Sequence, residues 1–363
     1  MREHGLDRRA QKDRRETFVA GAKPEPIEEI QHVERNGSLS MTRNSGFCRL
    51  RCQAADQAMF GVACSLFLLT ATPTWVYAQS YCAGYGCDSS ECASAHARNC
   101  TCKSCSRGTL FLWSRVPNVR GGPDLCAPLV TDRPDFTEAS STVGLGVAQW
   151  EVGYTYTFDD DGATSAKSHS YPEPLLRYGI LADWLEMRVG WNYSDEEVGG
   201  VAADGSEDLY LGFKIGLTPQ DGILPEMALI PQMTVPTGDD AFSADEVLPG
   251  LNWIYGWEVN DFVSTAGSTQ FNRAIDEGTG DAFTEWAQSW TFGYSLTDKI
   301  GAYTEYFGLY PTSADTTVPE HYFNGGFTYL VCDDVQWDIR AGTGLNDAAD
   351  DYFVGTGLSL RFK

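Results

Sequence analysis

The chain has 363 residues, enough for one large domain with accessory segments. It carries 50 Asp and Glu residues against 26 Lys and Arg residues, a net charge of −24, whereas nucleic-acid binding needs clustered cations. No uninterrupted apolar stretch has the length of a membrane-spanning helix. The composition therefore argues against both a nucleic-acid-binding protein and a helical membrane protein.

The N-terminal part of the chain has the layout of an export signal. Residues 1–40 are charged and show no periodicity, so we interpret them as an over-extended or disordered N-terminus. From Met41 onward, basic residues precede an apolar run at 58–71, and a small-x-small pattern ends just before Gln79. This order predicts a signal peptide over residues 41–78, with a buried core helix as the alternative.

A cysteine-dense segment follows at residues 79–110. It holds six cysteines: Cys82, Cys87, Cys92, Cys100, Cys102 and Cys105. Outside the cytoplasm such spacing predicts disulfide bonds, although six cysteines allow fifteen pairings. A metal site is the alternative, because Cys102, Cys105 and His96 are ligand types. Residues 111–142 then read as a linker, which contains Cys126.

Residues 143–363 break into segments in which apolar and polar side chains alternate. The clearest lie at 149–158, 185–193, 208–217, 285–296, 335–342 and 352–362. Weaker ones lie near 175–180, 226–236, 248–257, 262–271, 300–310 and 321–330. Since alternate side chains of a strand point to opposite faces, we expect about twelve strands, each with one apolar face.

The connections between these segments alternate in length. Long polar gaps are expected at 159–174, 194–206, 237–247, 272–282 and 311–320. Short turns are expected at 181–184, 218–224, 258–261, 297–299 and 331–334. Together with aromatic residues near segment ends, this predicts an all-β protein: an antiparallel up-and-down transmembrane β-barrel in the outer membrane. A soluble β-sandwich or lipocalin-like barrel is the alternative, since it also alternates.

Several short motifs occur in a fixed order along the predicted barrel. They begin with the sequence LVTDRPDFTE at 129–138, continue with QWEVGY at 149–154 and VPTG at 235–238, and finish with EYFG at 305–308 and DDYFVGTGL at 350–358. In these motifs the chain resembles the bacterial family described as the MetA-pathway of phenol degradation. The resemblance implies an outer-membrane channel for small, often aromatic or hydrophobic, molecules. The cysteine-rich segment is not part of this pattern.

Charged residues gather on the polar face of the predicted strands. They are Glu151, Arg177, Glu186, Arg188, Asp208, Lys214, Glu285, Glu305, Asp338, Arg340 and Arg361. In a barrel these side chains would point into the lumen, where mixed charges set the width and field of a pore. The alternative is that they only neutralise one another inside a nearly filled barrel.

Two features before and between the strands extend this interpretation. Asp132, Arg133 and Asp135 precede the first strand and could fold back into the lumen as a plug or latch, or belong to an ordinary polar linker. Cys126 and Cys332 are both expected at the periplasmic end of the barrel, which suggests a disulfide that tethers the pre-barrel segment.

The function predicted from these features is passive passage of small molecules, with the lipid bilayer and the barrel-assembly machinery as partners. A structural or surface-interaction barrel is the alternative; a lipid-modifying enzyme is less favoured, because no G-x-S-x-G motif is present. The acidic loops lack the spacing of a calcium site. We expect no catalytic residues, no metal and no cofactor.

Overall fold

The computed structural model describes residues 108–111, 122–125, 127–162, 164–276 and 278–363. The predicted N-terminal extension, the signal peptide, nearly all of the cysteine-rich segment, and Cys126 lie outside these residues. The described residues belong to one compact unit, Pro73–Lys363. Within them, no helix is long and apolar enough to cross a membrane.

Fifteen β-strand segments make up the fold. In chain order they are β1 (Ala148–Asp160), β2 (Ser165–Tyr171), β3 (Leu175–Gly179), β4 (Leu185–Gly190), β5 (Tyr193–Val198), β6 (Val201–Ser206), β7 (Leu209–Thr218), β8 (Glu226–Val235), β9 (Leu248–Glu258), β10 (Val263–Ile275), β11 (Ala282–Ser295), β12 (Ile300–Thr312), β13 (Glu320–Cys332), β14 (Val335–Gly344) and β15 (Tyr352–Phe362).

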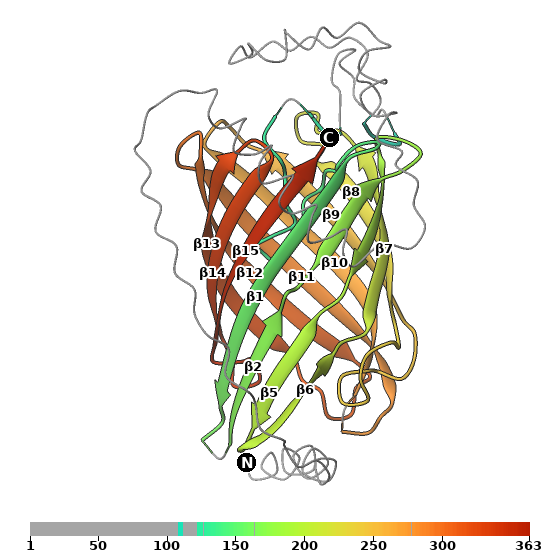
Figure 1. The fold of residues 1–363 in the computed structure, drawn as a ribbon, viewed down its shortest axis with the longest axis vertical. Coiled ribbons are helices and arrows are strands. Elements are labelled where there is room, and N and C mark those ends of the chain that lie inside the picture. The colour runs from blue at the N-terminus through green and yellow to red at the C-terminus, as the bar shows by residue number, and fades with distance from the viewer. Residues whose placement is uncertain (1–107, 112–121, 126, 163, 277) are drawn as a thin grey trace, which may run out of the picture. The chain divides into compact units, whose positions relative to one another are not determined.

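These segments form one antiparallel sheet that closes on itself. β15 pairs over its whole length with β1, from Phe362 opposite Ala148 to Tyr352 opposite Phe158 (Figure 1). Short interruptions at 172–174, 191–192 and 207–208 divide three long strands into β2 and β3, β4 and β5, and β6 and β7. Fifteen segments therefore make twelve barrel strands, which confirms the predicted number and the antiparallel up-and-down barrel. Closure leaves no free edge along the seam between first and last strands.

The barrel has its apolar side chains outside and its charges inside. Large apolar residues such as Phe213, Trp253, Trp290 and Trp337 stay exposed on the outer face. The side chains that alternate with them are buried and polar or charged: Glu151, Arg177, Glu186, Arg188, Lys214, Ser289, Glu305 and Asp338. A soluble β-sandwich or lipocalin-like barrel would show the reverse arrangement, with an apolar core. The outer face is suited to lipid.

Two of the expected long gaps are wrong. Residues 159–174 contain the end of β1 and the whole of β2, and residues 194–206 contain most of β5 and the whole of β6. These strands reach the end of the barrel opposite the C-terminus (Figure 1). Their polar composition hid them, because side chains beyond the membrane need no apolar face. Gly199 and Gly200, both with positive φ, form the two-residue turn between β5 and β6.

Candidate functional site: the charged interior of the barrel

Three cations from adjacent strands lie together on one side of the interior. Arg177 of β3 is the register partner of Arg188 of β4, and Lys214 of β7 pairs with Glu186 of β4. All three cationic side chains reach the carboxylate of Asp132. Arg177 lies 3.2 Å away, the Lys214 ammonium donates to Oδ1 at 2.6 Å, and Arg188 forms a third ion pair. Asp132 is therefore the common anion of this cluster.

Three further carboxylates pair with these cations: Glu151, Glu186 and Glu138, the last through an ion pair with Arg188. Arg177 pairs with Glu186 at 2.8 Å and with Glu151 at 3.0 Å, and Glu151 also accepts a hydrogen bond from Gln149 at 2.9 Å. Apart from Glu138, these side chains are almost fully buried. Buried ions are tolerated only when they are paired and hydrogen-bonded, so this network holds its members in fixed positions.

Asp132 belongs to residues 129–143, which we call the luminal segment. On the opposite wall, Glu305 of β12 accepts hydrogen bonds from the backbone nitrogens of Phe136 and Thr137, each at 2.7 Å. Asn324 of β13 donates to the same carboxylate at 2.8 Å. The luminal segment thus bridges the interior, from the cationic cluster on β3, β4 and β7 to Glu305 on β12.

Arg133 of the luminal segment lies at the seam of the barrel. Its guanidinium pairs with Glu173 at 2.6 Å and donates to the backbone carbonyl of Thr356 in β15 at 3.2 Å. Asp338 of β14 lies 3.5 Å from Arg133 Nε. One side chain therefore contacts the strand interruption at 172–174 and two strands on the other side of the seam.

Both ends of the luminal segment are attached to the barrel wall. At its start, Leu129 N donates to the carbonyl of Asp333 at 2.7 Å, and Arg361 donates to the carbonyl of Ala127 at 2.7 Å. At its end, Val143 N donates to Glu186 at 2.9 Å. Cys332 is disulfide-bonded, and because Cys126 lies outside the described residues, their pairing stays a prediction. The segment is held along its length.

The remaining predicted lumen residues have different surroundings. Arg340 donates to Pro134 O of the luminal segment at 3.0 Å, whereas Arg361 pairs with Asp334 at 2.8 Å beside the turn at 333–334. Glu285 is half-buried on β11. Asp208 departs from its predicted role: it lies in the interruption at 207–208, where its carboxylate accepts backbone hydrogen bonds from the 237–244 loop. Those loop amides hold Asp208 away from the interior charge network.

Sequence reasoning missed the uncharged part of the interior. Thr137 donates to Glu305 at 2.6 Å, and Ser289 lies within hydrogen-bonding distance of both Thr137 and Ser268. An aromatic cluster of Phe307, Tyr322 and Phe353 lies nearby. Ser289 and Asn324 share the parity of Glu285 on β11 and Glu320 on β13, and this signal could have found them. Phe307 and Phe353 likewise share the parity of Glu305 on β12 and Arg361 on β15, so the same signal could have placed them inside the barrel.

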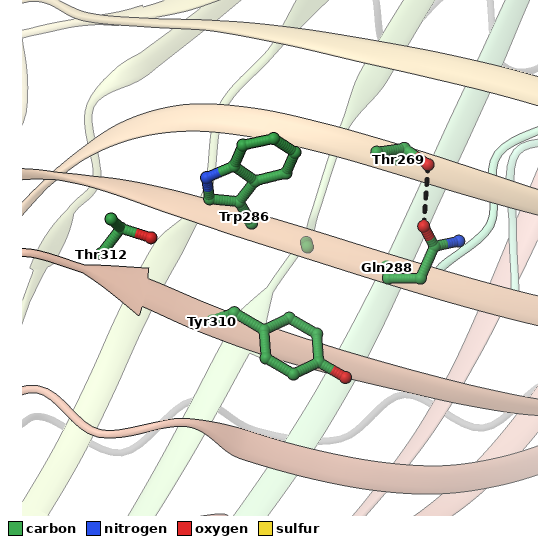
Figure 2. A pocket seen from close by; sticks show the side chains of 6 residues that line it. Thr269, Trp286, Gln288, Tyr310 and Thr312 are labelled. Carbon is green, nitrogen blue, oxygen red and sulfur yellow. Dashed lines mark hydrogen bonds between the residues drawn. The ribbon is translucent and has the colours of Figure 1, made fainter.

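A shallow pocket of about 350 Å³ lies on the outer face of β10, β11 and β12. Its lining includes Trp286, Tyr310 and Gln288, and Gln288 accepts a hydrogen bond from Thr269 at 2.8 Å (Figure 2). Trp286 is exposed, whereas Ala287, the next residue, is buried against the interior. This pocket therefore belongs to the membrane-facing surface and not to the charged interior.

The fold is similar to solved outer-membrane barrels at low identity. The NanC porin matches with a TM-score of 0.38 and 9% identity, over 59% of this chain and 98% of that chain. The translocator domain of the autotransporter NalP from Neisseria meningitidis matches with a TM-score of 0.42 and 12% identity, over 60% of this chain and 89% of that one. The KdgM porin in complex with disordered oligogalacturonate matches with a TM-score of 0.37 and 9% identity, over 59% and 99%.

A search of curated proteins finds no match to this sequence. A protein-family model does match, and it covers residues 131–362, from the luminal segment to the end of β15. The match includes the twelve barrel strands and the residues that fill their interior. A closed barrel with an apolar outer face places this chain in the outer membrane. The chain belongs to the family described as the putative MetA-pathway of phenol degradation.

Proposed function

We propose that this protein is an outer-membrane channel for the passive passage of small molecules through a mixed-charge lumen. The supporting observation is the closed barrel whose interior carries both signs of charge while its outer face is apolar. A wall of alternating cations and carboxylates sets the field that a permeating solute meets. The wall residues proposed for this role are Glu151, Arg177, Glu186, Arg188, Lys214, Glu285, Glu305, Asp338, Arg340 and Arg361.

The luminal segment is the proposed constriction of this channel. Asp132 ties it to three cations on one wall, and Glu305 ties it to the other wall. Because both ends of the segment are also bonded to the barrel, the segment acts as a latch that stays in the lumen and narrows it. Channel width then depends on how firmly Asp132 is held.

The test is planar-bilayer conductance of the refolded, signal-free protein and of the variant Asp132→Asn. Loss of the carboxylate charge leaves Arg177, Arg188 and Lys214 with one fewer counter-ion, so we expect larger conductance steps and a shift toward anion selectivity. Asp240→Asn, a change at an exposed loop position, is the matched control and should conduct like the wild type. Heat-modifiable gel mobility shows that each sample is folded.

Three results would count against the proposal. Wild-type and Asp132→Asn barrels that are folded but equally silent would contradict a channel. Equal conductance in the two proteins would contradict the proposed latch but would be compatible with the channel. Hydrolysis of phospholipid by the same samples would favour a lipid-modifying enzyme. Such an enzyme would need a histidine base, and the two histidines among the described residues, His169 and His321, each contact a tyrosine hydroxyl at 2.8 Å.

A further inference from the structure

The interior of the barrel contains one apolar feature that its charge network does not explain. Phe307 of β12, Tyr322 of β13 and Phe353 of β15 are 9%, 6% and 8% exposed and pack together on the luminal wall. The rings of Phe307 and Tyr322 are stacked, with centroids 4.7 Å apart and planes 16° apart. Phe353 lies tilted against Phe307 at 6.5 Å and edge-on to Tyr322 at 6.2 Å. We call these three residues the aromatic wall cluster.

A fourth ring stacks on this cluster, and it comes from the luminal segment. Phe136 lies face to face with Phe307, with centroids 4.5 Å apart and planes only 3° apart. Stacked aromatic rings attract one another beyond the area that they bury. Phe136 is only half-buried although its ring stacks on the cluster. A detached planar ring would adopt the same position on Phe307.

The ring of Phe136 is not needed to hold its own backbone. The Phe136 and Thr137 backbone nitrogens are bonded to Glu305, and the neighbouring Pro134 carbonyl accepts from Arg340. These bonds stay in place when the Phe136 side chain rotates about its own bonds. Exchange of Phe136 for another ring therefore requires a change of rotamer and no displacement of the luminal segment.

We propose that Phe307, Tyr322 and Phe353 form a stacking site for a planar aromatic solute, and that Phe136 fills this site when the solute is absent. The proposal rests on the channel function and names the solute class that the interior selects. Arg340 supports the site from behind, since its guanidinium lies 5.5 Å from the centre of the Phe353 ring. Phe136 competes with the solute from within the same chain.

The test compares two bicyclic alcohols that differ in planarity, 1-naphthol and its saturated counterpart decahydro-1-naphthol. Binding to the refolded barrel in detergent is measured by calorimetry for the wild type and for Phe136→Leu, which keeps an apolar side chain but removes the ring. We expect Phe136→Leu to bind 1-naphthol about 3–10-fold more tightly, because the competing stack is gone. Binding of decahydro-1-naphthol should change by less than about twofold.

Two further variants show whether the wall cluster is the site. Phe307→Leu in the Phe136→Leu background should weaken 1-naphthol binding by about tenfold. Phe323→Leu, next to Tyr322 on β13 but exposed on the outer face, is the matched control and should bind like the wild type. Unchanged 1-naphthol affinity in Phe136→Leu, or equal gains for both alcohols, would overturn the proposal.

Conductance of the same samples separates this inference from the channel function. A conducting barrel in which Phe136→Leu leaves 1-naphthol binding unchanged contradicts the stacking site alone. A silent barrel that shows the predicted order of affinities supports the site and contradicts passage. Heat-modifiable gel mobility shows whether each variant is folded.

Discussion

Two glycines at the barrel seam make room for Arg133. Gly153 of β1 and Gly357 of β15 are register partners, and a Cβ at either position would overlap the Arg133 guanidinium. The absence of two side chains opens a slot across the first and last strands, and the guanidinium occupies it. Glu173 and the carbonyl of Thr356 then fix its position. At this pair of positions the sequence must supply glycine because a side chain from elsewhere needs the space.

Gly357→Ala should therefore loosen the seam. The added methyl group forces the Arg133 guanidinium away from Glu173 and Thr356, and loss of these hydrogen bonds should reduce the free energy of unfolding by about 1–3 kcal/mol. Urea unfolding followed by heat-modifiable mobility measures the change. Gly216→Ala is the matched control, since its nearest neighbour would lie at 3.4 Å, an ordinary contact. Equal losses in both variants would show that the Arg133 slot is not the cause.

At the scale of single elements, the strands at the end of the barrel opposite the C-terminus were the hardest to predict. The strands that face lipid alternate strongly, as in β14 with Trp337 and Ile339 outside and Asp338 inside. β2, β5 and β6 lack this signal, because few of their side chains are apolar on either face. The Gly199-Gly200 pair was the available clue to the β5–β6 hairpin, since both residues need positive φ.

The luminal segment was predictable only in part. Clustered charges before the first strand suggested a latch, but its partners depended on which residues the closed barrel brings together. Asp132 and Lys214 lie 82 positions apart, and Phe136 and Glu305 lie 169 apart. Alternation within a strand says which face a residue occupies but carries no information on contacts across the lumen. For the same reason the stack of Phe136 on Phe307 could not be foreseen.

The loop at 345–351, between β14 and β15, should respond to pH. Its Asp350 is partly buried near Glu320 and Asp159, and burial together with these charges raises the pKa of Asp350 from 3.8 to about 6. The folded loop then binds a proton more tightly than the unfolded loop does. The contribution of Asp350 to loop stability is thus full below pH 4 and declines as the pH rises through about 6.

Hydrogen exchange of the 345–351 amides, corrected for intrinsic rates, measures this dependence. In the wild type we expect protection to fall between pH 4 and pH 6, the window set by the ordinary and raised pKa values of Asp350. Asp350→Asn should give a flatter profile, with greater protection than the wild type at pH 7.5. Asp347→Asn, in the same loop, is the control and should keep the wild-type profile. A flat wild-type profile would contradict the role of Asp350.

For the whole molecule, the decisive property is that the polarity of the barrel is reversed relative to a soluble protein. Its interior is a network of paired charges, whereas its outer face carries exposed Trp and Phe residues on β7, β9, β11, β13 and β14. Because this reversal follows from the alternation of single strands, the sequence alone was sufficient to predict the barrel and its twelve strands. The register of β1 against β15 and the contacts inside the lumen could be determined only from the closed structure.

The reversed polarity predicts how the barrel responds to a charge on its outer face. Phe213, in the middle of β7 and 45% exposed, should face hydrocarbon, so Phe213→Arg should cost about 2–4 kcal/mol of unfolding free energy in lipid vesicles. Val201→Arg is the matched control. Val201 is 38% exposed at the start of β6, beside the Gly199-Gly200 turn, where we expect it to face water, so its replacement should cost less than about 1 kcal/mol. In a soluble barrel both residues would face water, and the two substitutions would have similar small effects. Equal unfolding free energies for the two variants would therefore contradict a contact between Phe213 and hydrocarbon. A loss of stability confined to Phe213→Arg would show that the apolar outer face contacts the membrane.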